Sequence, residues 1–278
     1  MPADTYLSTI LATHRARAAA DDRSLDELLA RAEAQPPTRP FLGALAAPAG
    51  EALAVIAEVK RRSPSKGVIA AGLDPAQVAA DYAAGGAACL SVLTDEEFFG
   101  GSAADLAAAR AACALPVLRK DFTVGDADVC DARLMGADAV LLIVAALSDA
   151  ELLGLVTLAH ELSLDALVEV HDEAELERAL GAGAEMVGVN QRDLTTFAVD
   201  PGRAERLGGR IPPEVVAVAE SGITGPDDAR RLAGVGYQAV LVGESLVRAA
   251  DRRAAVRDLT GQRIGARHAP RDAYRARG

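Results

Sequence analysis

Short apolar runs alternate with alanine-rich stretches along most of this chain. The runs are apolar at nearly every position, which is typical of strands covered on both faces. The stretches between them have helical spacing, and several follow a capping residue such as Ser102, Ser148 or Asp172. We predict strands at 53–59, 88–93, 115–119, 138–144, 165–170, 185–190, 214–219 and 238–242. The predicted helices span 75–84, 102–112, 125–136, 148–162, 172–181, 201–208, 225–234 and 244–257.

This alternation favours a (β/α)8 barrel as the fold class. Eight strands, each followed by a helix and repeated roughly every 25–30 residues, are the signature of that α/β fold. The alternative is a doubly wound open sheet, which would normally carry a glycine-rich dinucleotide turn after its first strand. The segment at 60–67 reads KRRSPSKG instead.

Two helical segments precede the first predicted strand. Residues 4–20 carry apolar side chains at helical spacing, and Ser24 caps a second stretch at 25–34. The proline-rich segment QPPTRP (35–40) then ends the helix. We therefore expect one domain over 1–258, a barrel with an N-terminal helical extension at 4–34.

An Arg-rich tail is expected over 259–278. Residues 252–278 carry eight Arg against two Asp, a formal charge of +6, in a chain whose net charge is −11. One interpretation is a solvated tail beyond the last helix. The other is a tail that docks on the acidic body of the protein or on an acidic partner.

Composition excludes several classes of function. A net charge of −11 and an aromatic content of 3% do not suit a protein that binds nucleic acid through basic stripes and stacked rings. The sequence has neither a run of about 18 apolar residues nor a recognisable export signal, so we expect a cytoplasmic protein without membrane contact. Cys89, Cys113 and Cys130 are widely spaced without a nearby His, which predicts small core residues rather than a metal site.

Lysine is rare, and its positions are informative. The chain contains 26 Arg but only three Lys, and Lys60, Lys66 and Lys120 all follow the first or third predicted strand. In a barrel, the carboxyl ends of the strands form the catalytic face. Because Lys can exchange protons near neutral pH and Arg cannot, this choice indicates acid–base chemistry.

Other polar residues lie at the same strand ends. Glu58 and Lys60 are two residues apart and point to one face, either as chemistry or as a structural ion pair. Glu169 is costly to bury alone and should face Lys60 or Lys120. We interpret His171 as a loop or cap residue.

The loops after the last two strands predict a phosphate site. Ser221-Gly222 and Gly243 follow these strands, where barrels of this class bind phosphate through backbone N–H groups and helix N-termini. Glycine at these positions allows the backbone to approach an anion closely.

Eight segments together resemble one family, indole-3-glycerol phosphate synthase of tryptophan biosynthesis. The likeness covers roughly residues 5–255, in order, and touches every predicted strand. The segments are IAEVKRRSPSKG (56–67), SVLTDEEFFGGS (91–102), PVLRKDF (116–122), ADAVLLIVAAL (137–147), ALVEVHDEAEL (166–176), GVNQRDLTTF (188–197), VAESGI (218–223) and AVLVGESLVRA (239–249).

The resemblance implies a reaction that needs no cofactor and no metal. The substrate would be 1-(2-carboxyphenylamino)-1-deoxyribulose 5-phosphate, and the products indole-3-glycerol phosphate, CO2 and water. Lys120 matches the general acid that protonates the ribulose carbonyl. Lys60 matches the residue that holds the anthranilate carboxylate and assists dehydration. Glu58, Glu169 and Asn190 match groups that position the lysines and assist proton transfer.

The resemblance also implies substrate-binding residues. Phe99 matches an aromatic residue on the anthranilate ring, and Arg192 matches a site residue beside Asn190. The segments before the first strand match helices that cap the pocket. The phosphate and hydroxyl contacts would come from Ser63, Ser221, Gly222, Gly243 and the backbone of Glu244.

Two positions depart from the family pattern. Gln191 stands where Asn is common, and its parity directs it away from the pocket. Glu244 puts an acid in the phosphate loop, so its side chain must turn outward. Two other functions stay open: the neighbouring isomerase of the pathway, whose first strand typically carries Cys or Asp, and a barrel that binds ligand without catalysis. The sequence does not determine the oligomeric state.

Overall fold

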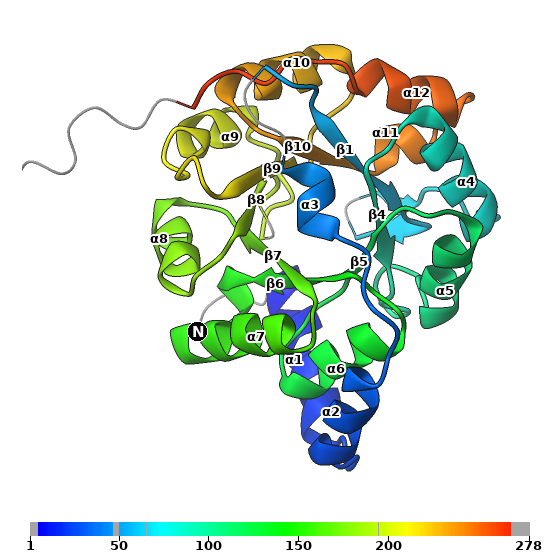
Figure 1. The fold of residues 1–278 in the computed structure, drawn as a ribbon, viewed down its shortest axis with the longest axis vertical. Helices are drawn as coiled ribbons and strands as arrows, with labels where there is room; N and C mark the ends of the chain where they lie inside the picture. Colours follow the sequence, from blue (N-terminus) through cyan, green and yellow to red (C-terminus); the bar gives the residue numbers. More distant parts are fainter. Residues whose placement is uncertain (1–4, 47–49, 65, 194, 268–278) are drawn as a thin grey trace, which may run out of the picture.

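Eight parallel strands close into a barrel in the computed structural model, which describes residues 5–46, 50–64, 66–193 and 195–267 (Figure 1). Closure is direct, because β1 pairs with β10 on one side and with β4 on the other. This excludes the open-sheet alternative. The barrel strands are β1 (Ala54–Val59), β4 (Cys89–Leu93), β5 (Val117–Lys120), β6 (Ala139–Ile143), β7 (Asp165–Val170), β8 (Met186–Asn190), β9 (Val216–Glu220) and β10 (Ala239–Val242).

The eight predicted strands are therefore confirmed, and helices cover the barrel from outside (Figure 1). Ser102, Ser148 and Asp172 accept backbone N–H bonds at helix starts, as their positions predicted. The covering helices are α4 (Pro75–Gly85), α5 (Ala103–Ala112), α6 (Asp126–Leu134), α7 (Asp149–Glu161), α8 (Glu173–Gly181), α9 (Pro201–Gly208), α10 (Pro226–Val235), α11 (Glu244–Val247) and α12 (Arg252–Leu259), with a 3-10 turn η1 (Val144–Ala146) after β6.

The prediction of a single helix over 244–257 was wrong. The segment 244–257 forms two helices, α11 and α12, because Asp251 begins a new helix by accepting a bond from the Ala254 N–H at 3.0 Å. The break leaves α11 as a single short turn directly after β10, beside the carboxyl end of the barrel.

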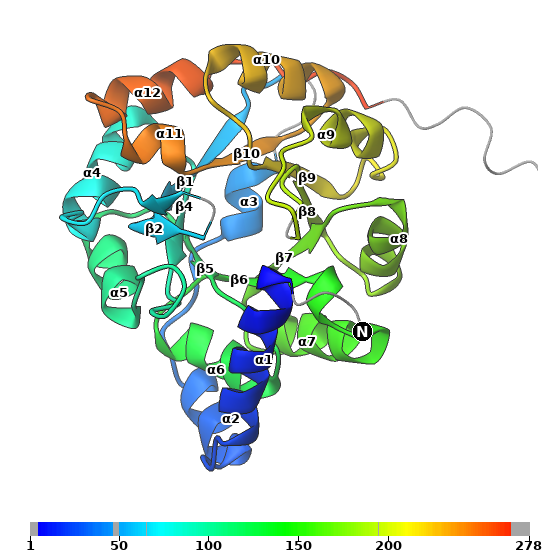
Figure 2. The same cartoon turned by 180° about the vertical axis from the view of Figure 1, so that it is seen from behind.

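The two ends of the barrel are closed by different segments. A helix that the sequence did not predict, α3 (Phe41–Leu45), lies over the amino end (Figure 1). Its Phe41 and Leu45 are fully buried. The Asp165 carboxylate at the start of β7 accepts the Leu42 N–H at 2.7 Å. Seen from behind, α1 (Tyr6–Ala19) crosses in front of the opposite end, the face that holds the polar residues (Figure 2).

The N-terminal extension divides its contacts between two helices. Thr5 caps α1, and Ser24 caps α2 (Leu25–Glu33), which packs its buried face on α6. A small hairpin of β2 (Arg62–Ser63) and β3 (Gly67–Val68) follows β1 and reaches the same end of the barrel as α1. Among the described helices, none has the length and apolar character that a membrane span requires.

The C-terminal segment packs further than the predicted edge at residue 258. Ile264 is 4% exposed and donates its N–H to Glu51 O, and Arg267 donates to Val215 O and Gln238 Oε1, both at 2.8 Å. These contacts lie beside the amino ends of β1, β9 and β10. The packed unit therefore continues at least to Arg267, and the rest of the predicted tail, 268–278, lies outside the described residues.

The three cysteines are free. Cys89 and Cys130 are buried, Cys113 is half-buried, and burial raises the pKa of the Cys89 thiol. They are packing residues in this fold, which agrees with the sequence interpretation.

Candidate active site

A cavity of about 810 Å3 opens at the carboxyl ends of the strands. It is lined by residues within or directly after every strand of the barrel and by α1. The twelve site residues expected from the sequence all line it: Glu58, Lys60, Ser63, Phe99, Lys120, Glu169, Asn190, Arg192, Ser221, Gly222, Gly243 and Glu244. Gln191 does not line it, and its Nε2 donates to Ser221 O at 2.7 Å instead.

Lys120 lies at the centre of the polar cluster. Its Nζ donates to Glu169 Oε2 and Glu220 Oε2, both at 3.1 Å, and its side chain is only 14% exposed. Burial opposes the charge on Lys120, but Glu169, Glu220 and Glu58 outweigh it and raise its pKa. The residue is thus held as a cation.

Glu169 is held from two sides. The Asn190 amide donates to Glu169 Oε1 at 3.0 Å, while Lys120 binds the other oxygen. Burial raises the pKa of Glu169, yet Lys120 and His171 more than reverse this and bring it to about 2. The sequence left Lys60 and Lys120 open as its partner, and the structure selects Lys120.

Glu220 belongs to this cluster and was missing from the predicted site. It ends β9 after an apolar run, and Glu58 and Glu169 are the last residues but one of their strands, so a similar signal was present in the sequence. Its Oε1 is buried without a hydrogen-bond partner among the described residues. One cation cannot compensate two buried carboxylates, and burial together with Glu169 raises the pKa of Glu220 to about 7.

Replacing Glu220 with glutamine should change how stability depends on pH. A carboxyl whose folded-state pKa is raised binds more protons when folded, so its contribution to stability is full below pH 4.5 and is lost as the pH rises to about 7. Glutamine mimics the protonated form at every pH. The free energy of unfolding of Glu220→Gln, relative to wild type, should rise across this window by at most about 1.4 kcal/mol per pH unit. Urea titrations at several pH values measure it, and a flat difference would contradict it.

Two glycines, one within β8 and one directly after β10, make room for two of the carboxyl groups. A Cβ at Gly188 would lie 2.1 Å from Glu220 Oε1, and one at Gly243 would lie 2.2 Å from Glu58 Oε1. Gly243, which the sequence analysis connected with phosphate, therefore also leaves space for Glu58. Glu58 forms an ion pair with Lys60, as their shared parity predicted.

The far side of the cavity has backbone suited to an anion. Ser221 and Gly222 have φ angles of 64° and 71°, a region that residues other than glycine seldom adopt. The Glu244 side chain lies 3.5 Å from Arg248 Nε. The backbone N–H of Glu244 is at the start of α11. Lys66 and Arg248 also line the cavity and add positive charge that the predicted site did not include.

The remaining wall is apolar and partly aromatic. Tyr6, Leu7 and Ile10 of α1 line the cavity, with Phe99 and Phe197 from the loops. The Tyr6 ring meets Phe197 edge-on with centroids 5.5 Å apart. This wall suits a flat aromatic ligand, whereas the backbone at Ser221 and Gly222 suits a phosphate.

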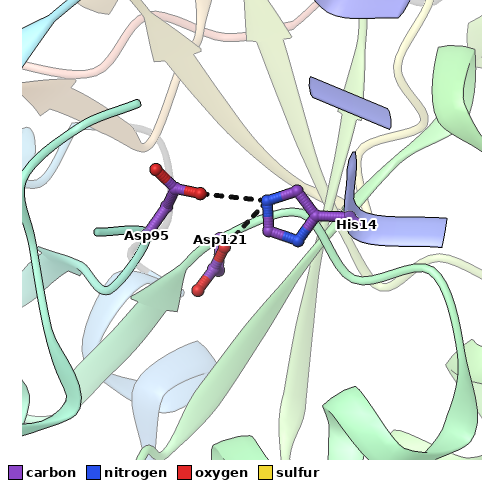
Figure 3. Close-up of side chains that lie close together, drawn as sticks. All are labelled: His14, Asp95 and Asp121. Carbon is purple, nitrogen blue, oxygen red and sulfur yellow. Dashed lines mark hydrogen bonds and ion pairs between the residues drawn. The ribbon is translucent and has the colours of Figure 1, made fainter. Parts of the chain in front are cut away.

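Helix α1 is held to this wall by a buried histidine (Figure 3). His14 Nε2 lies 3.0 Å from Asp95 Oδ2 and 4.0 Å from Asp121 Oδ1. Asp95 Oδ1 also accepts the N–H groups of Phe98 and Phe99, at 2.6 and 3.0 Å. Burial opposes the charge of Asp95, but His14 and these amides lower its pKa. One carboxylate thus connects α1 with the loop that carries Phe99.

This cluster has metal-ligating residue types, yet its oxygens are already used. Asp121 Oδ2 accepts from Thr94 and Arg119, and Asp121 Oδ1 accepts the Phe122 N–H at 2.9 Å. The Arg119 guanidinium also contributes a positive charge against a cation at this place. The donors around the two carboxylates favour a hydrogen-bonded anchor for α1 over a metal site.

Replacing His14 with alanine should loosen this anchor and raise KM. A buried hydrogen bond to a charged group is worth about 2 kcal/mol, and its loss frees the helix that carries Tyr6, Leu7 and Ile10. We expect about a tenfold rise in KM, a smaller change in kcat and a lower Tm. Arg17→Ala is the matched control, because the exposed Arg17–Glu97 pair joins the same helix and loop at little energetic value. Unchanged KM and Tm in His14→Ala would contradict the anchoring role.

Fold and site together define a class of protein. In this (β/α)8 barrel, the lysines and carboxylates at the strand ends face two loops whose backbone suits an anion. This arrangement is typical of barrel enzymes that use acid–base chemistry on phosphorylated small molecules. Residues 7–259 match the family model of indole-3-glycerol phosphate synthase. The chain belongs to the indole-3-glycerol phosphate synthase family, whose members are decarboxylating lyases of tryptophan biosynthesis.

Named relatives agree with this assignment. The chain is 53% identical to indole-3-glycerol phosphate synthase 1 of Streptomyces coelicolor over 247 residues, which cover 88% of this chain and 91% of the relative. It is 58% identical to the enzyme of a Nocardioides species, over 74% and 80% of the two chains. A solved thiamine phosphate pyrophosphorylase from Pyrococcus furiosus shares the fold alone, with a TM-score of 0.57, 18% identity, and coverage of 74% and 93%.

Proposed function

We propose that the cavity binds 1-(2-carboxyphenylamino)-1-deoxyribulose 5-phosphate and closes the indole ring, with Lys120 as the general acid. The observation that carries this assignment is the buried Lys120 cation, which lies in the cavity and is held by Glu169 and Glu220 at 3.1 Å each. As the aromatic ring carbon attacks the ribulose carbonyl, negative charge develops on its oxygen. A fixed cation with a transferable proton stabilises that charge most where it is largest.

Loss of CO2 and water completes the reaction. The carboxylate leaves as CO2 when the ring regains aromaticity, and the hydroxyl leaves as water after gaining a proton. We assign proton transfer in these steps to Glu169, oriented by Asn190, and to the Glu58–Lys60 pair. Glu220 shares Lys120 with Glu169, and its raised pKa suits a group that holds a proton near neutral pH.

Substrate orientation follows from the two walls of the cavity. The phosphate would lie at Ser221, Gly222, Gly243 and the Glu244 N–H, with Ser63 on the neighbouring hairpin. The anthranilate ring would lie against Phe99 and α1. The anthranilate carboxylate would then lie near Lys60.

We propose one folded unit from the N-terminal helices to Arg267. Because buried Cys89 and Cys130 are free thiols, we also propose a cytoplasmic location.

Replacing Lys60 with alanine should raise KM for the carboxylated substrate by at least about tenfold and lower kcat as well. The first effect is the loss of a charge-assisted contact, and the second is the loss of proton transfer during dehydration. Lys60→Arg keeps the charge but not the exchangeable proton, so it should recover KM more than kcat. Steady-state kinetics measure both. Normal KM and kcat in Lys60→Ala would make Lys60 a structural partner of Glu58.

One assay tests the whole proposal. Adding the substrate to the purified protein should produce the fluorescence of an indole, together with one equivalent of CO2. An isomerase would convert the preceding phosphoribosyl compound without forming an indole. A non-catalytic barrel would bind substrate without turnover. Either of those results would overturn the proposal.

A further inference from the structure

His171 occupies a buried position behind the cavity, between two glutamates. It follows β7 directly, and its side chain is 12% exposed without lining the cavity. Its Nδ1 lies 3.0 Å from Glu175 Oε2 on α8, and the same oxygen accepts the His171 backbone N–H at 2.7 Å. Its Nε2 lies 3.5 Å from Glu169 Oε1. The three side chains therefore form a row, Glu175–His171–Glu169, that ends at the Lys120 cluster.

Both ring nitrogens of His171 face a carboxylate, and this decides the protonation state of the ring. A neutral imidazole has one N–H, so a ring that donates to Glu175 through Nδ1 would direct the Nε2 lone pair at the Glu169 carboxylate. Nε2 is buried and has no hydrogen-bond partner among the described residues. A doubly protonated ring removes the conflict, because both nitrogens then carry a proton toward a carboxylate.

The surrounding charges favour that cation. Glu169 on β7 and Glu175 on α8 face the ring, and the positive charge of Arg203 on α9 opposes them. Arg203 itself donates to Asn190 O at 2.9 Å. Burial lowers the pKa of His171, but the two glutamates reverse this and raise it.

We propose that His171 is a positioning residue that, as an imidazolium, holds Glu169 ionised and directed at Lys120 and the cavity. Lys120 and Asn190 bind Glu169 from the cavity side, and His171 supplies the charge from behind. Lys120 and His171 both favour the ionised form of Glu169, so loss of the cation behind it would make Glu169 easier to protonate. This inference rests on the acid–base role proposed for Glu169.

The consequence is a specific effect on the pH dependence of catalysis. Without the imidazolium, Glu169 would hold its proton to a higher pH, since a nearby opposite charge favours the ionised form. His171→Gln keeps an N–H donor near the same place but removes the charge. We expect the acidic limb of its kcat profile to move up by about one pH unit, with kcat at the optimum reduced less than about tenfold and KM nearly unchanged.

Two further variants separate charge from shape. Glu175→Gln removes the carboxylate that favours the imidazolium while keeping the side-chain outline, so it should shift the limb in the same direction by less. His160→Gln is the matched control, because His160 is half exposed and lies 3.7 Å from the exposed Glu185. It should leave the profile unchanged. A His171→Gln profile that coincides with wild type would overturn the proposal.

A direct measurement on the wild-type enzyme makes the test independent of variants that fail to fold. Nitrogen-15 NMR of the histidine rings reports the protonation of each ring nitrogen. We expect His171 to be doubly protonated at pH 7 in the substrate-free protein, and a neutral ring there would overturn the proposal. If the ring is charged but Glu169→Gln retains wild-type turnover, it is the proposed role of Glu169 that fails.

Discussion

Replacing Lys120 with methionine should lower kcat by about a thousandfold or more, while substrate affinity stays within about tenfold. Methionine fills similar space but carries neither charge nor proton. The contribution of Lys120 is concentrated in the transition state, where the carbonyl oxygen becomes an alkoxide, so the loss appears in kcat. Single-turnover fluorescence and substrate titration measure the two quantities separately.

Lys120→Arg is the informative companion of this variant. Arginine keeps the cation beside Glu169 and Glu220, so the buried carboxylates remain compensated and the fold is preserved. It cannot release a proton near neutral pH, and activity should still be lost. Circular dichroism and thermal unfolding would verify that both variants fold. Unchanged kcat in a folded Lys120→Met protein would remove this residue from the mechanism.

Replacing Glu169 with glutamine should lower kcat by about 100-fold or more, the usual size of an acid–base contribution. Glutamine retains the outline of the side chain and can still contact Asn190 and Lys120. It cannot ionise, whereas Lys120 and His171 lower the pKa of Glu169 to about 2 and so keep that carboxylate ionised. The deficit should be largest in the steps after ring closure, which pre-steady-state kinetics would reveal as an accumulating intermediate.

Glu173→Gln is the matched control for this second variant. Glu173 lies four residues further along the chain, at the exposed start of α8, and takes no part in the cluster. It should behave like wild type in kcat and KM. Wild-type kcat in a folded Glu169→Gln protein would assign the carboxylate a purely structural part beside Lys120.

The amino-acid sequence by itself determined the repeating architecture of this protein. Strands covered on both faces must be apolar throughout, and the helices between them need a capping residue and a buried apolar stripe. Both kinds of element can therefore be recognised from the local sequence. Parity along a strand likewise determined that Glu58 and Lys60 share a face, because side chains alternate. The polar residues at the ends of most apolar runs marked the carboxyl end of the barrel.

Only the tertiary structure decided which groups meet. Lys120 ends β5, and its partners Glu169 and Glu220 end β7 and β9, so their contact depends on closure of the barrel rather than on spacing in the chain. Glu220 was overlooked for that reason, since its signal alone did not indicate a partner. Helix α3 and the segment around Ile264 were missed because each is too short to show a period. The buried contact of His14 with Asp95 likewise joins residues that are far apart in the sequence. A side chain's partner, and hence its charge, is a property of the assembled fold.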